Sequence, residues 1–278
     1  MLEIGVVFGL GSAVAWGAGD FVGGLAARRS GAIAVAAGAT VVGFALLLLL
    51  LAIVRPALPP AEVVLLGGFA GVAGGLGLAA LYRGLSLGSM GLVAALSGVG
   101  SVLLPLIVGV WLAGDVIDPL QWVGVAAALA AGAAASGATL RGVNAAALRM
   151  GLVAAIGFGL WYVILDRAAE THELWALVAS RGSSSVIVGG LALARGGARG
   201  LRSSWRLVLA AGALDLGGNA GFVLARGTLP VGIAAALSGL YPIATMLLAR
   251  GVIGEALPRL GVAAVALAVC GIVLISLG

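Results

Sequence analysis

The sequence predicts an all-α integral membrane protein of ten transmembrane helices, built as two inverted five-helix repeats, and three observations lead to this fold class. Only 9% of the 278 residues are charged, too few to cover a water-facing surface, since a soluble domain carries about 25%. The apolar runs approach or exceed the roughly 20 residues that cross a bilayer. The pentamer "AALSG" occurs at 94–98 and again at 235–239, about half a chain later.

Ten helices can be placed along the chain, and their apolar runs do not alternate as the strands of a membrane barrel would. The expected helices span 4–27, 32–54, 63–83, 90–113, 119–140, 150–166, 174–194, 207–226, 231–250 and 258–277. The longest connections, "RPALPPAE" (55–62) and "RGGARGLRSSWR" (195–206), are too short for a separate soluble domain.

The repeat extends along the whole chain, because four segments match in register at displacements of 140 to 143 residues. The matches are "GLGSAVAWGAGDF" (9–21) with "GLVAAIGFGLWYV" (151–163), "YRG" (82–84) with "ARG" (225–227), "AALSG" with "AALSG", and "LAGD" (112–115) with "VIGE" (252–255). We therefore expect two domains, residues 1–140 and 150–278, of five helices each. Because five is odd, the second half starts from the opposite side of the membrane, an inversion typical of secondary transporters.

The order of these motifs gives the chain a family resemblance. With "WGAGDFVGG" (16–24), "ARG" followed by "AALSGLYP" (235–242), and "GE" (254–255), the sequence resembles the EamA branch of the drug/metabolite transporter superfamily. The resemblance implies a ten-helix carrier with a central cavity, whose members export amino acids and other metabolites. The family often has an arginine near the start of the second helix of each half. Here the second half has Arg181, whereas the first half has Ala39.

Composition argues against an enzyme, a cofactor and a nucleic-acid partner. The chain has no lysine, so the lysine-dependent phosphate loop of nucleotidases is absent. A single Cys270, expected to be a small packing residue, and a single His172 cannot form a metal cluster. The hydrolase-like pattern "GLSLG" (84–88) has no strand before it. The arginines flank apolar runs, where they anchor helices to the membrane surface.

Three ionisable residues within helices are the first candidates for a solute or proton path, since such residues are costly in a bilayer. Asp215 shares one helical face with Asn219, and Arg181 lies in the preceding, antiparallel helix. The depths of Arg181 and Asp215 differ by about 6 Å, at 1.5 Å per residue. An ion pair that only joins helices and a role in a cavity both remain open for these two residues.

Further candidates are polar or aromatic. Asp20 lies near the end of its expected helix, so we expect it to reach interfacial water, and Trp16 on the same face to pack. The segment "SGLYP" combines a hydroxyl, a phenol and Pro242, which favours a cavity, whereas Pro105 is expected to be a static kink. The complete candidate set for a substrate or proton path is Asp215, Arg181, Asn219, Asp20, Trp16, Tyr241, Ser238 and Ser97.

The arginines also predict an orientation. Connections after the odd-numbered expected helices carry Arg28, Arg29, Arg83, Arg141, Arg149, Arg195, Arg199, Arg202, Arg206, Arg250 and Arg259, and even-numbered ones carry Arg55, Arg167 and Arg226. Basic connections stay in the cytoplasm. This places the odd connections inside and both termini outside, whereas the resemblance implies termini inside.

Together these observations predict a multi-pass secondary transporter in the plasma (inner) membrane of a bacterium, exporting small metabolites by alternating access. Its expected partners are a small-molecule substrate and the lipid bilayer, with proton coupling through a buried carboxylate. The alternative is a non-transporting polytopic membrane protein, such as a sensor or an assembly partner.

Overall fold

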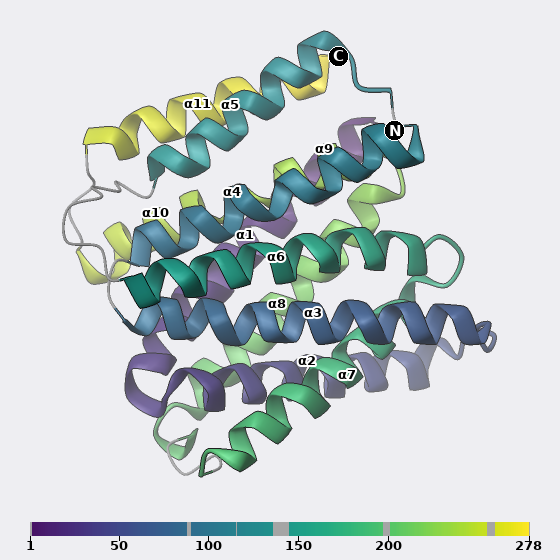
Figure 1. Cartoon of the computed structure of the whole chain (residues 1–278), viewed down its shortest axis with the longest axis vertical. Coiled ribbons are helices and arrows are strands. Elements are labelled where there is room, and N and C mark those ends of the chain that lie inside the picture. The colour runs from purple at the N-terminus through teal and green to yellow at the C-terminus, as the bar shows by residue number, and fades with distance from the viewer. Residues whose placement is uncertain are drawn as a thin grey trace.

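The computed structural model describes residues 2–87, 90–114, 116–135, 145–196, 201–254 and 259–277, and these residues form helices and no strand (Figure 1). The α-helices are α1 (Leu2–Ser30), α2 (Ala32–Val54), α3 (Ala61–Ser86), α4 (Met90–Val108), α5 (Pro119–Ala135), α6 (Ala145–Ala168), α7 (Glu173–Ala194), α8 (Trp205–Arg226), α9 (Val231–Ser238), α10 (Tyr241–Ile253) and α11 (Arg259–Leu277). A π-helical turn (Gly109–Ala113) extends α4, and a short 3₁₀ helix (Leu201–Ser203) precedes α8.

Seven helical stretches of the described residues are long and apolar enough to cross a membrane. They are Glu3–Ser30, Ala32–Val54, Ala61–Ser86, Ala145–Ala168, Glu173–Ala194, Trp205–Arg226 and Val231–Ile253. Shorter apolar helices occupy Leu96–Leu112 and Pro119–Ala131. A multi-pass membrane protein is therefore supported, and the count of ten crossings stays a prediction.

The helix expected at 231–250 is broken, although not at its proline. The helix α9 ends at Ser238 and α10 starts at Tyr241, so Pro242 lies in the first turn of α10, where its missing N–H has no intrahelical acceptor to lose. Pro105, in contrast, lies inside α4, which continues to Val108 before the π-helical turn. At the first connection, Gly31 alone joins α1 to α2 with a φ of 85°, a conformation that favours glycine.

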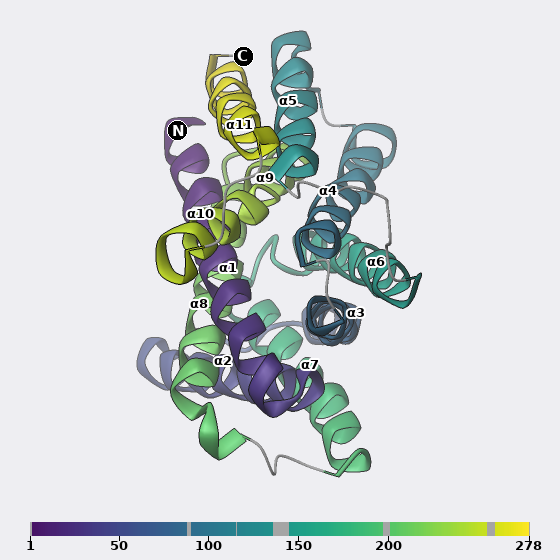
Figure 2. The same cartoon turned by 90° about the vertical axis from the view of Figure 1, so that its left-hand side faces the viewer.

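The helices pack in a pattern that is the same for the two halves. The helix α3 packs along α6, and α8 packs along α1, so in each pair the third helix of one half packs along the first helix of the other. The helix α2 packs against α7, and α5 packs against α11, each next to its own counterpart. Figures 1 and 2 show α5 and α11 at one end of the molecule and α2 and α7 at the other.

Small residues set the closest of these approaches. A Cβ added to Gly67 of α3 would lie 2.7 Å from the carbonyl oxygen of Ala176 in α7, and one added to Gly71 would overlap that of Ser180. The Ser184 hydroxyl donates to the Gly71 carbonyl at 2.6 Å. Gly67 and Gly71 therefore form a surface of small residues on which α7 packs closely. Large apolar side chains such as Leu49, Leu65 and Phe69 remain exposed on the outside, as expected for a surface that meets lipid.

Candidate solute-binding cavity

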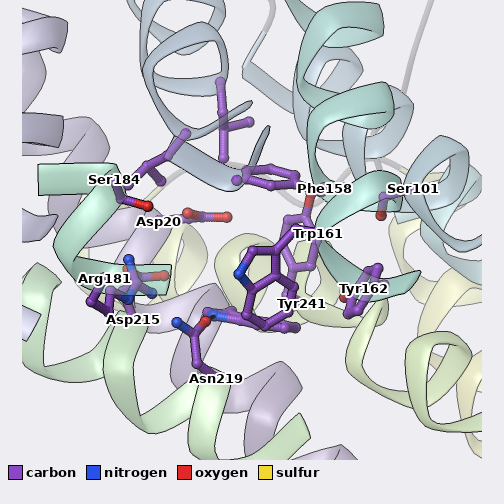
Figure 3. A pocket seen from close by; sticks show the side chains of 14 residues that line it. Asp20, Ser101, Phe158, Trp161, Tyr162, Arg181, Ser184, Asp215, Asn219 and Tyr241 are labelled. Atoms are coloured by element: carbon purple, nitrogen blue, oxygen red, sulfur yellow. Dashed lines mark hydrogen bonds and ion pairs between the residues drawn. The ribbon is translucent and has the colours of Figure 1, made fainter. Parts of the chain in front are cut away.

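A cavity of about 50 Å³ lies between the helices at the centre of the molecule (Figure 3). Its lining residues are Trp16, Asp20, Gly74, Leu78, Leu81, Ser101, Phe158, Trp161, Tyr162, Arg181, Ser184, Asp215, Asn219 and Tyr241. They come from α1, α3 and α4 of the first half and from α6, α7, α8 and α10 of the second. Both halves therefore build one cavity.

Arg181 and Asp215 form an ion pair on one wall of the cavity. Arg181 Nη2 of α7 lies 2.5 Å from Asp215 Oδ2 of α8, and the two side chains are only 8% and 13% exposed. The predicted proximity of these residues is confirmed. Gly43 of α2 faces the arginine, and a Cβ there would be in ordinary van der Waals contact with Arg181 Cδ, at 3.6 Å. Arg181 Nε is buried and has no hydrogen-bond partner among the described residues.

Trp16 and Asn219 join α1 to α8 beside this ion pair. The Trp16 indole Nε1 donates to Asn219 Oδ1 at 3.0 Å, which leaves the buried Asn219 Nδ2 without a partner in the described part of the chain. Trp16 also packs edge-on against Trp161 and Tyr162, with ring centroids 5.8 Å apart in each case. The packing role expected for Trp16 is thus present, but the same ring also lines the cavity.

The expectation that Asp20 reaches interfacial water is wrong. Asp20 is only 9% exposed and lines the cavity, where Figure 3 shows it between Ser184 and Trp161. Asp20 is buried because α1 packs along α8, and α1 continues to Ser30, ten residues or about 15 Å beyond Asp20. Among the described residues, Asp215 is paired with Arg181, whereas no basic partner is seen for Asp20.

The hydroxyl candidates of α4, α9 and α10 are only partly brought into the cavity. Tyr241 lines it, and its hydroxyl lies 2.6 Å from that of Ser97 in a buried hydrogen bond. Ser238 is fully buried at the end of α9, and its hydroxyl has no partner among the described residues, but it is not part of the lining. On α4, it is Ser101, one turn after Ser97, that lines the cavity.

Sequence reasoning missed much of the aromatic wall. Phe158, Trp161 and Tyr162 of α6 line the cavity, and none of them was among the candidates. The signal that could have found Tyr162 was its alignment with Asp20 in the repeat, since equivalent positions of two inverted halves face a common centre. Cys270, expected to pack inside, is exposed on α11.

The cavity offers a definite set of interactions to a solute. Asp20 provides a carboxylate, Asn219 Nδ2 and Arg181 Nε provide buried donors without partners in the described chain, and the rings of α1 and α6 provide apolar walls. A few convergent polar groups in an otherwise apolar cavity are typical of small-molecule sites. Within the described residues, no group of three or more His, Cys, Asp or Glu side chains could hold a metal ion.

This architecture, a bundle of apolar helices in which two halves line one central cavity, is that of a polytopic membrane protein. The model of the EamA-like transporter family matches twice, over residues 3–136 and 146–277. The chain belongs to this family, which is part of the drug/metabolite transporter superfamily. A solved structure described only as "Crystal structure of protein" is 21% identical, with a TM-score of 0.69 over 97% of this chain and 95% of that chain, and so shares the fold. A comparison with curated proteins gives no match.

Proposed function

We propose that this protein is a secondary transporter that exports small metabolites across the plasma membrane of a bacterium by alternating access. Its halves, residues 1–140 and 150–278, are inverted five-helix repeats that together cross the membrane ten times. Membership in the EamA-like family supports transport, since the family is one of transporters.

The observation that carries the proposal is the shared cavity. Its lining comes from seven helices of both halves, and the halves pack through equivalent helix pairs, α3 with α6 and α8 with α1. A cavity between two similar, oppositely oriented halves can be exposed first to one side of the membrane and then to the other. This is the arrangement that alternating access requires.

Asp20 is the residue to which we assign recognition of a cationic group or a proton. It is buried in the cavity, and no basic partner offsets its charge among the described residues. A carboxylate in this setting is stabilised by a solute ammonium group or by protonation, because burial disfavours an unpaired charge. Asp215, already paired with Arg181, is the less available of the two carboxylates.

The test is solute uptake into vesicles that contain the purified protein, screened over a mixture of metabolites with and without a pH gradient. We expect uptake of at least one small solute, and loss of its pH dependence in Asp20→Asn. Asp118→Asn is the matched control, because it also removes one acidic group. Asp118 is exposed, and its carboxylate caps α5 by accepting from the Leu120 N–H, which asparagine can still do.

Two outcomes would contradict the proposal. Absence of uptake for every solute, in vesicles where the protein is folded, would favour the non-transporting alternative of a sensor or an assembly partner. Unchanged pH-dependent uptake in Asp20→Asn would remove Asp20 from its assigned role, and the same loss in Asp215→Asn alone would move that role to Asp215.

A further inference from the structure

We propose that two separate joints gate the central cavity, one at each membrane side: Tyr82 seated on Gly23, and the ion pair between Asp166 and Arg226. The inference rests on the proposed transport by alternating access and names the contacts that would open in turn. The first joint lies on the side of the connections after α1 and α3, here called the odd side. The second lies on the side of the connections after α6 and α8, the even side.

The cavity lies between two helix pairs, so contacts that join the pairs on either side of it can close it. Trp16, Asp20, Asp215 and Asn219 line it from the pair of α1 and α8. Phe158, Trp161 and Tyr162 line it from the pair of α3 and α6. Packing within each pair is extensive, whereas α1 meets α3 only locally and α6 is joined to α8 by an ion pair. The pairs also touch at the cavity, where Trp16 packs on Trp161 and Tyr162, and α2 and α7 bridge them at one edge. The contacts of α1 with α3 and of α6 with α8 are the ones that lie near the helix ends, toward the two membrane sides.

The odd-side joint is a close contact of a ring with a glycine. Tyr82 of α3 is fully buried, and a Cβ added to Gly23 of α1 would lie 2.5 Å from Tyr82 Cζ. The Tyr82 hydroxyl has no hydrogen-bond partner among the described residues. A buried hydroxyl without a partner disfavours the closed joint, because it would regain hydrogen bonds to water on opening. The contact is thus tight but easily released.

The even-side joint is an ion pair. Arg226 Nε of α8 lies 2.6 Å from Asp166 Oδ1 of α6, and Arg226 Nη1 donates to the Ala169 carbonyl at 3.4 Å. The Asp166 and Arg226 side chains are 24% and 15% exposed. Water can therefore replace the partner when the helices separate, which limits the energy that holds a partly exposed pair.

The joints occupy neighbouring positions in the two halves, since Gly23 and Tyr82 each lie one residue before a position that aligns with the ion pair. The match of "YRG" with "ARG" aligns Arg83 with Arg226, and the match of 9–21 with 151–163 continues to align Gly24 with Asp166. Each half thus joins its first and third helices near their C-terminal ends, and the ends of the two halves lie on opposite sides. The chemistry differs, since the first half has glycine where the second has the aspartate.

The test measures which side of the membrane can reach the cavity. In a Cys270→Ser background, Ser101→Cys places one thiol in the cavity, at a residue whose hydroxyl donates to the Gly98 carbonyl of its own helix. A charged, membrane-impermeant methanethiosulfonate reagent is then added to either side of vesicles with oriented protein. The labelling rate reports opening without any need for transport.

At the even side, Asp166→Asn should raise the labelling rate from that side by about fivefold, the equivalent of one partly exposed ion pair. Labelling from the odd side should not rise. Glu170→Gln is the matched control. Glu170 lies at the same membrane side, but its ion pair with Arg167, three residues earlier, does not link one helix pair to the other. The exchange variant Asp166→Arg with Arg226→Asp should restore the low rate.

At the odd side, two substitutions should act in opposite directions. Gly23→Ala should raise labelling from the odd side, because the methyl group displaces Tyr82. Tyr82→Phe should lower it, because the closed joint no longer buries an unpaired hydroxyl. Gly11→Ala is the control on α1, since a Cβ there meets nothing within 4 Å.

The proposal is overturned if Asp166→Asn and Glu170→Gln label alike, if Asp166→Asn raises labelling equally from both sides, or if the two odd-side variants shift in the same direction. If labelling changes as expected but no solute is taken up, the transport function is contradicted and the two joints remain supported. Uptake of a solute, together with labelling rates that none of these variants changes, would support the transport function and contradict the two joints.

Discussion

The hydroxyls of Ser97 and Tyr241 lie 2.6 Å apart, in a buried hydrogen bond that joins α4 of the first half to α10 of the second. Ser97 belongs to the first copy of "AALSG", and Tyr241 follows the second copy by two residues. The repeated segment was the first sign of two halves, and the bond shows that its two copies meet at the centre of the molecule.

The bond between Ser97 and Tyr241 predicts a coupled loss of stability. Ser97→Ala and Tyr241→Phe should each lower the free energy of unfolding by about 0.6–2 kcal/mol, the range for hydrogen bonds between membrane helices. Because both substitutions remove the same bond, the double variant should lose less than the sum. Reversible unfolding in mixed micelles measures all three, and strict additivity would show that the bond contributes nothing.

The ion pair of Arg181 and Asp215 predicts that single variants are worse than the double variant. Arg181→Leu or Asp215→Leu should destabilise by about 3–5 kcal/mol, since each leaves a buried charge without its partner. The charge-free double variant should recover much of that loss. The measurement is again the free energy of unfolding, compared for the four proteins of the cycle. A double variant at least as unstable as the worse single one would contradict a mutual neutralisation.

The packing of α3 against α7 predicts a sharp difference between neighbouring glycines. Gly71→Ala should destabilise by about 1–3 kcal/mol, because the new methyl would overlap the Ser180 carbonyl of α7. Gly68→Ala should change stability by less than about 0.5 kcal/mol, because a Cβ there meets nothing within 4 Å. Thermal unfolding of the two variants separates them. Equal midpoints would mean that α3 and α7 are not held at this distance.

The arginine count predicts the orientation. A reporter fused after Gly278 should be active outside the cytoplasm, and one inserted at Arg195 should be active inside, because basic connections are retained on the cytoplasmic side. A cytoplasmic signal at the C-terminus would show that the orientation implied by the family resemblance overrides the charges. Fusions in successive connections should alternate, and the number of alternations counts the crossings.

The sequence by itself determined the local and periodic features of this protein. Apolar runs and sparse charge fixed the membrane class, because few charged groups cannot hydrate a surface. The internal matches defined two halves, and the family model matches the chain in two corresponding segments. Similar depths of Arg181 and Asp215 in consecutive antiparallel helices anticipated their approach, although α7 packs mainly on α2 and α3, and α8 on α1 and α2.

Only the tertiary structure decided which faces meet. Asp20 is buried because α1 packs along α8 and extends past its expected end. The residues next to Asp20 in the sequence reveal neither feature. The pairing of Asp166 with Arg226 spans 60 residues, and Phe158 and Tyr162 became cavity walls only when α6 met α3. Helix formation depends on residues within one or two turns, so a sequence shows it directly. Helix pairing instead depends on glycines and side chains that fit each other across long separations, and this complementarity exists only in the folded chain.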